Sequence, residues 1–110
     1  MTKKQLIRET FRLKVFKRAR FRCQGPGCIA SSKAYNDDEL DAHHITDRTL
    51  MPNGGYVVEN GIALCNTCHL KAEQYHVTGI AHQGYEPETL YKIIGSSYDL
   101  AIKASERLGV

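Results

Sequence analysis

Apolar residues recur at helical spacing near the start of the chain. Ile7, Phe11 and Val15 stand four residues apart with Phe16 beside them, and no Pro or Gly interrupts residues 3–19. Residues four apart lie on one face of an α-helix, so the pattern predicts a helix over residues 3–19 that buries one stripe. Its other positions are mostly basic or polar.

The middle of the chain predicts two short strands. Apolar residues within 40–45 and 62–64 favour strands, and Pro52-Asn53-Gly54-Gly55 is a strong turn signal between them. Residues 46–59 therefore read as a loop joining the two strands. The stretch 70–75 then favours a helix.

Residues that begin and end helices occur in the C-terminal part of the chain. Pro87 suits a helix start, Gly95 a helix stop, and Ser97 the N-cap of a last helix that runs to about Leu108. At 110 residues, with 42% hydrophobic and 25% charged residues, the chain fits one globular domain. No apolar run could span a membrane, and the N-terminus lacks the apolar core of a secretory signal. We therefore expect a protein of the reducing cytoplasm.

Charge is unevenly distributed along the sequence. Residues 1–22 hold nine basic residues against Glu9 alone, whereas the remainder holds six basic and eleven acidic residues. This asymmetry would give the folded domain a positive face, for which a polyanion is the natural partner. A basic helix face that is merely solvated is the alternative.

Four cysteines form two pairs, Cys23 with Cys28 and Cys65 with Cys68. In a secreted chain they would suggest two disulfides, but in the cytoplasm thiols stay reduced and metal binding is the better interpretation. Residues 25–27 are Gly-Pro-Gly, a tight turn that can present both sulfurs of the first pair to one ion. The spacing therefore predicts one four-cysteine structural zinc site.

Histidines lie between and after the cysteine pairs. His43 and His44 are adjacent, and His69 directly follows the last cysteine. Because the thiols complete the zinc site, these imidazoles are available for a second, open site that does chemistry. His76 and His82 are isolated, and we expect packed or surface side chains there.

These residues resemble a known family. The run Asp41-Ala42-His43-His44-Ile45, then Asn60, then the run from Leu64 to His69, resembles the HNH nucleases over about residues 15–73, and the cysteine pairs are similar to the zinc-stapled branch common in bacteria and their phages. The resemblance implies an α+β fold: a small ββα-metal core with a four-cysteine zinc and flanking helices. It would form one HNH domain over 1–110, comprising a basic helix at 3–19, the core at 20–76 and a helical extension at 77–110.

The resemblance also implies residue roles. His44 would be the general base, His43 and His69 would ligate the catalytic ion, and Asn60 would fix the loop that supports the base. Glu73 lies four residues after His69, hence on the same helix face, and is either a further ligand or a solvated residue. Asp41 either accepts a hydrogen bond from a ligating histidine or simply ends an acidic loop.

Hydrolysis of a phosphodiester needs a base for the water and a cation for the developing charge, so both histidine rings are expected to face one cleft where the first strand ends. The rate should then rise as the base loses its proton, near the reference imidazole pKa of about 6.5 unless the cation moves it.

The implied function is a metal-dependent DNA endonuclease that leaves 5′-phosphate and 3′-hydroxyl ends. Mg²⁺ or Mn²⁺ would be the catalytic ion, although two imidazoles also suit Ni²⁺ or Zn²⁺. Double-stranded DNA would be bound with weak sequence preference by basic residues flanking the motif: Arg18, Arg20, Arg22, Arg48 and Lys71. Phage or restriction proteins are the protein partners this resemblance suggests, with the chain a monomer or weak dimer. The alternatives are a non-catalytic zinc-stapled nucleic-acid-binding module and a domain that binds another protein.

Overall fold

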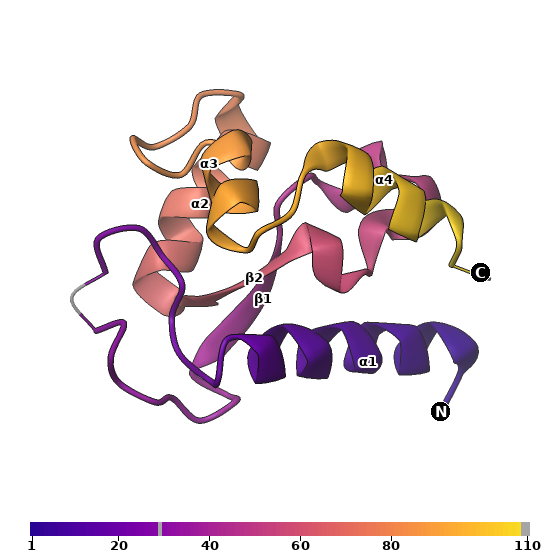
Figure 1. Cartoon of the computed structure of the whole chain (residues 1–110), viewed down its shortest axis with the longest axis horizontal. Helices are drawn as coiled ribbons and strands as arrows, with labels where there is room; N and C mark the ends of the chain where they lie inside the picture. Colours follow the sequence, from indigo (N-terminus) through magenta and orange to yellow (C-terminus); the bar gives the residue numbers. More distant parts are fainter. Residues whose placement is uncertain (29, 109–110) are drawn as a thin grey trace.

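The computed structural model describes residues 1–28 and 30–108, and its first element is the long helix α1, Lys3–Arg18 (Figure 1). Thr2 caps this helix: its hydroxyl accepts from the Gln5 N–H at 3.1 Å, and the Gln5 side chain accepts from the Thr2 N–H at 2.8 Å. This reciprocal pair satisfies two of the N–H groups that a helix start leaves free. The predicted N-terminal helix is confirmed and ends one residue earlier than expected.

Two antiparallel strands form the sheet. β1 is Leu40–His44 and β2 is Gly61–Cys65, with His43 paired to Ile62 and His44 to Gly61. Both predicted strands are present, with bounds that differ by a residue. The loop predicted between them contains three short 3₁₀ turns: η1 Arg48–Leu50, η2 Pro52–Gly55 and η3 Val58–Asn60.

Helix α2, Asn66–Thr78, follows β2 without a linker. It begins four residues before the predicted start at position 70, because the extended backbone of Cys65 serves as its N-cap. Cys68 and His69 consequently lie in the first turns of the helix. The two C-terminal helices occur as predicted, α3 at Pro87–Ile93 and α4 at Tyr98–Glu106, with the Ser97 hydroxyl accepting from the Leu100 N–H at 3.1 Å.

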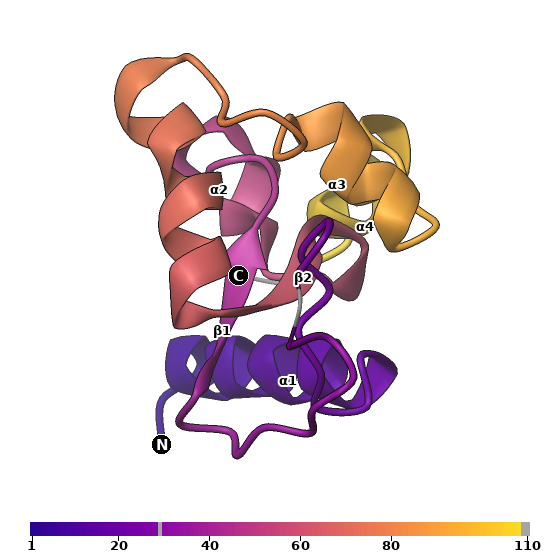
Figure 2. The ribbon, with the colours of Figure 1, turned by 90° about the vertical axis from the view of Figure 1, so that its left-hand side faces the viewer.

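The two faces of the sheet are covered by different helices, α1 on one face and α2 on the other (Figures 1 and 2). Phe11, Val15 and Phe16 of α1 pack with Leu40 and Ala63 of the sheet. Gly61 allows this close approach, because a Cβ there would lie 2.5 Å from Val15 Cγ2.

On the opposite face a larger apolar cluster joins the sheet to α2, α3 and α4, and includes Ile62, Leu64, Ala72, Leu90 and Ala101. The β1–β2–α2 order is the ββα arrangement that was expected, so the α+β fold class is confirmed. Within the described residues, none of the helices combines the length and apolar character that crossing a membrane requires.

Candidate zinc site and candidate nuclease site

The four cysteines meet in one place. One pair comes from the loop after α1 and the other from the junction of β2 with α2, and the four sulfurs lie within 4.8 Å of one another. All four are free thiols. Gly25 makes room for them, since a Cβ at this position would lie 2.6 Å from Cys68 Sγ. The arrangement fits a four-coordinate structural zinc and accounts for the Gly-Pro-Gly turn.

Hydrogen-bond donors surround these sulfurs. The backbone N–H groups of Cys65 and Gly25 donate to Cys23 Sγ at 3.3 and 3.4 Å, and the Tyr85 hydroxyl donates to Cys68 Sγ at 3.2 Å. Burial nevertheless raises the pKa of the Cys23 and Cys68 thiols. Because burial disfavours the charged form, these thiols become thiolates only beside a cation, and a bound zinc ion would supply that charge.

The histidine doublet divides between the two faces of the sheet. The His43 ring faces α2, with its centroid 5.2 Å from that of His69. The His44 ring faces α1, with centroids 4.7 Å from Phe11 and 4.6 Å from Tyr56. The expectation that both rings face one cleft is therefore wrong. β1 continues through His44, and consecutive side chains of a strand point in opposite directions.

Beside α2 the structure brings together one imidazole of β1 and two side chains of the helix. Ligand atoms of His43, His69 and Glu73 all lie within 4.8 Å of one another. Glu73 Oε1 is 3.3 Å from His43 Nδ1 and 3.2 Å from His69 Nε2. On the far side of the His69 ring, Nδ1 lies 3.2 Å from Asp41 Oδ2, an outer contact of the kind that orients a ligating histidine.

The buried atom His43 Nδ1 tests whether this cluster suits a cation. It has no hydrogen-bond partner among the described residues, because the nearby Glu73 oxygen lacks hydrogen-bond geometry. Burial, with the imidazoles of His69 and His76 nearby, lowers the pKa of His43 far below its ordinary value, so the ring is neutral. A buried, neutral imidazole whose Nδ1 lies beside a carboxylate and makes no hydrogen bond is suited to hold a divalent ion.

The backbone of His44 is hydrogen-bonded to α2, and its ring is packed against neighbouring aromatic side chains. Its carbonyl accepts from His76 Nε2 at 2.8 Å, while its own Nε2 is buried without a partner in the described part of the chain. Burial, assisted by the positive charge of Arg48, lowers the pKa of His44 to about 4. The imidazole is therefore neutral near physiological pH, the protonation state that a general base requires.

Asn60 ties the loop together from a fully buried position. Its Oδ1 accepts from the Thr46 N–H at 3.0 Å and the Tyr91 hydroxyl at 2.7 Å. Its Nδ2 donates to the carbonyls of Thr46 at 3.1 Å and Gly55 at 3.2 Å. All four hydrogen-bonding positions of the amide are filled, so Asn60 joins the exit of β1 to the middle of the long loop.

The basic residues expected to contact phosphate differ in how far their side chains are bonded within the protein. The exposed residue Arg18 donates through its guanidinium to the carbonyls of Val58 at 2.6 Å and Gly61, so part of its donor capacity is used within the protein. Arg22 donates to the Ser32 carbonyl at 2.6 Å.

The other three expected phosphate contacts make no hydrogen bond to a backbone carbonyl of the described residues. Arg48 reaches the Tyr56 hydroxyl at 3.3 Å, and the Lys71 ammonium lies 5.9 Å from the Tyr85 ring centroid. Arg20 is exposed. These side chains keep most of their donors available to a bound polyanion, whereas Arg18 uses two of its five N–H groups to bond backbone carbonyls.

Two side chains next to the histidine doublet were not expected from the motifs. His76 stacks on the His43 ring at 5.1 Å besides bonding the His44 carbonyl, and Tyr56 packs against the His44 ring. Helical spacing could have identified His76, because positions 69, 73 and 76 share one face of α2. No local signal marks Tyr56, which reaches His44 from the loop.

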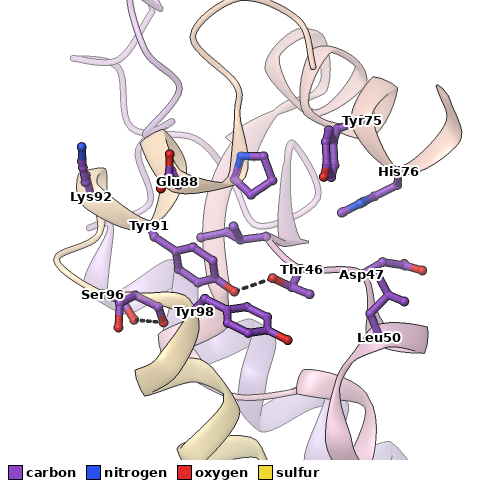
Figure 3. Close-up of a pocket in the computed structure, with 13 residues that line it drawn as sticks. Thr46, Asp47, Leu50, Tyr75, His76, Glu88, Tyr91, Lys92, Ser96 and Tyr98 are labelled. Carbon is purple, nitrogen blue, oxygen red and sulfur yellow. Dashed lines mark hydrogen bonds between the residues drawn. The ribbon is translucent and has the colours of Figure 1, made fainter. Parts of the chain in front are cut away.

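A cavity of about 640 Å³ opens beside residues 45–47, next to the histidine cluster (Figure 3). Its walls include Tyr75 and His76 of α2, Tyr91 of α3 and the half-exposed Tyr98 of α4. Figure 3 also shows the Tyr91 hydroxyl bonded to the Thr46 side chain, a 2.7 Å contact. The cavity therefore borders the same loop that Asn60 holds.

Comparison with known proteins agrees with this geometry. The HNH endonuclease family model matches residues 22–74, the segment that carries both cysteine pairs, the histidine cluster and Asn60. Residues 22–74 therefore form a domain of the HNH endonuclease family. The four neighbouring thiols fit the zinc-binding variant of that family. Searches of curated proteins and of solved structures returned no match to the chain.

Proposed function

We propose that this protein is a metal-dependent DNA endonuclease that hydrolyses phosphodiester bonds to 5′-phosphate and 3′-hydroxyl ends. The observation that carries the proposal is the convergence of His43, His69 and Glu73 beside α2. The next residue after His43 is His44, whose neutral imidazole has a buried Nε2 with no partner among the described residues. A zinc fold alone has no need of this second group of ligands.

The cation-binding residues are His43, His69 and Glu73, with Asp41 orienting the His69 ring. A divalent ion bound there would stabilise negative charge that develops on the phosphate and on the departing oxygen. Mg²⁺ or Mn²⁺ fits the carboxylate, while the two imidazoles also suit Ni²⁺ or Zn²⁺. The four cysteines hold the separate structural zinc and keep β2 and α2 in register with the loop after α1.

His44 is the general base, accepting a proton from the attacking water. In-line displacement at phosphorus places the attacking and leaving oxygens on opposite sides of the reacting atom. A base on one face of β1 and a cation cluster on the other are compatible with that requirement, provided the phosphodiester lies across the end of the strand. Asn60 keeps the backbone after His44 in place through Thr46.

Double-stranded DNA is the proposed substrate. Arg20, Arg22, Arg48 and Lys71 are the proposed phosphate contacts, while Arg18 is assigned a structural role because two of its donors bond backbone carbonyls. Phosphate contacts position a duplex without reading its sequence, so weak sequence preference is expected. The setting proposed is a bacterium or its phage, with phage or restriction proteins as partners and the chain as a monomer or weak dimer.

A plasmid nicking assay with added Mn²⁺ or Mg²⁺ tests the proposal. A nuclease converts supercoiled plasmid to nicked or linear forms only when the divalent ion is present. A non-catalytic binding module would retard the plasmid in a gel without cutting it, and a protein-interaction domain would do neither. Either of the last two results would refute the proposal.

A further inference from the structure

The segment after residue 74 lies outside the matched family region, yet several of its residues hydrogen-bond to the HNH domain, three of them through hydroxyl groups described next. The Tyr85 hydroxyl donates to Cys68 Sγ, the Tyr91 hydroxyl donates to Asn60 Oδ1, and the Ser105 hydroxyl accepts from the Gly55 N–H at 3.0 Å. Of these three contacts, only that of Tyr91 joins the loop at the histidine doublet.

We propose that Tyr91 of α3 is a positioning residue for the nuclease reaction, acting through Asn60 and Thr46 on the backbone that carries His44. This inference rests on the proposed function. It assigns to the C-terminal helices a part in the active site, in addition to their part in the apolar core.

The hydrogen bonds around Tyr91 have a single consistent direction. Asn60 Oδ1 can only accept, so the Tyr91 hydroxyl donates its proton there at 2.7 Å. The Thr46 hydroxyl, also 2.7 Å away, must then donate to the Tyr91 oxygen. Tyr91 thus occupies the second acceptor position of Asn60 Oδ1, and the same hydroxyl fixes the rotamer of Thr46.

Thr46 is held at three atoms by this network. Its N–H donates to Asn60 Oδ1, its carbonyl accepts from Asn60 Nδ2, and its hydroxyl bonds Tyr91. The Ile45 N–H in turn donates to the Asn60 carbonyl at 2.9 Å. Residues 45 and 46 therefore leave β1 in one defined direction, which fixes the position of His44 immediately before them.

Tyr91 itself has little freedom to move. Its side chain is 4% exposed, and its neighbour Leu90 is buried in the same apolar cluster as Ile45. Burial raises the pKa of Tyr91, so the phenol keeps the proton that it donates. The ring contributes to packing and the hydroxyl contributes to the network, so the two contributions can be separated by removing the oxygen alone.

Tyr91→Phe makes that separation, and single-turnover cleavage of plasmid DNA at saturating protein and Mn²⁺ measures the result. A displacement of about 1 Å at a reacting group can reduce a rate by as much as roughly 10²-fold, so we expect a loss of about tenfold or more in the rate constant. The zinc content, the DNA affinity and the Mn²⁺ concentration for half-maximal rate should stay unchanged. The matched control is Tyr98→Phe, because Tyr98 lines the same cavity but is 51% exposed, and it should cut at the wild-type rate.

Thr46→Val tests the same network from its other end. If the two hydroxyls act as one unit, the double variant with Tyr91→Phe should be no slower than the slower single variant, whereas independent effects would multiply. A purely structural role would lower the melting temperature while leaving the rate per folded molecule intact, and that result would overturn the proposal. An unchanged Tyr91→Phe rate in a protein that cuts would also overturn it. A wild type that fails to cut DNA would instead refute the proposed function and, with it, this role.

Discussion

Replacing Asn60 with alanine should destabilise the whole domain. Asn60 is 0% exposed, and its side-chain amide makes four hydrogen bonds. The substitution removes this amide, so the Thr46 N–H, the Tyr91 hydroxyl and two backbone carbonyls each lose a hydrogen bond. Each unsatisfied buried group costs about 1–3 kcal/mol, and a water entering the space would recover part of that. We therefore expect a loss of about 3–5 kcal/mol from the free energy of unfolding, a large share of the roughly 5–15 kcal/mol typical of a domain.

Urea denaturation of the zinc-loaded protein, followed by circular dichroism, measures this loss. Asn66→Ala is the matched control, because Asn66 is exposed at the start of α2 and should change the free energy of unfolding by less than about 0.5 kcal/mol. A loss below about 1 kcal/mol for Asn60→Ala would refute the reasoning, since such a loss is no more than that of one ordinary hydrogen bond. The long loop would then be held mainly by its apolar contacts.

Three further predictions concern metal, charge and pH. Purified protein should contain one zinc per chain by elemental analysis, and Cys65→Ala should lose it and unfold, because structural zinc contributes on the order of 10 kcal/mol. Arg20→Gln should reduce the log-log salt slope of DNA binding by roughly 0.9 per lost contact, whereas Arg18→Gln should lower the melting temperature instead, and the reverse pattern would contradict the assignment. With the pKa of His44 lowered to about 4, activity at saturating metal should be lost only as the pH falls toward that value, and an inflection near the ordinary imidazole value of about 6.5 would contradict it.

The order of elements could be predicted from the sequence because each has a local signal. The Ile7 and Phe11 spacing defines α1, Pro87 begins α3 and Ser97 caps α4, and all three act within one or two helical turns. The grouping of the cysteines follows from spacing and thiol chemistry. In each case the physical cause lies close to the residue along the chain.

The details of the site depend on contacts between distant segments, which no local pattern specifies. Strand alternation was known to separate adjacent side chains, but whether β1 would include His44 depends on its pairing with Gly61, and that pairing decides which face the ring takes. Arg18 carries the same charge as its neighbours, yet it lies beside carbonyls 40 and more positions away. Tyr91 meets Asn60 only because α3 packs against the sheet, so nothing near position 91 could have revealed the contact.

The division of roles within the histidine doublet is the centre of this account, and a Mn²⁺ titration of cleavage by His44→Ala and His43→Ala tests it most directly. His44→Ala should keep its fold, its zinc and its half-maximal Mn²⁺ concentration, yet cut roughly 10²- to 10⁴-fold more slowly, the range for losing a positioned base. His43→Ala should stay folded, require much more Mn²⁺ and recover part of its rate at high concentration. If His44→Ala cut at the wild-type rate, or needed more Mn²⁺ while His43→Ala did not, the roles assigned to the two histidines would be wrong.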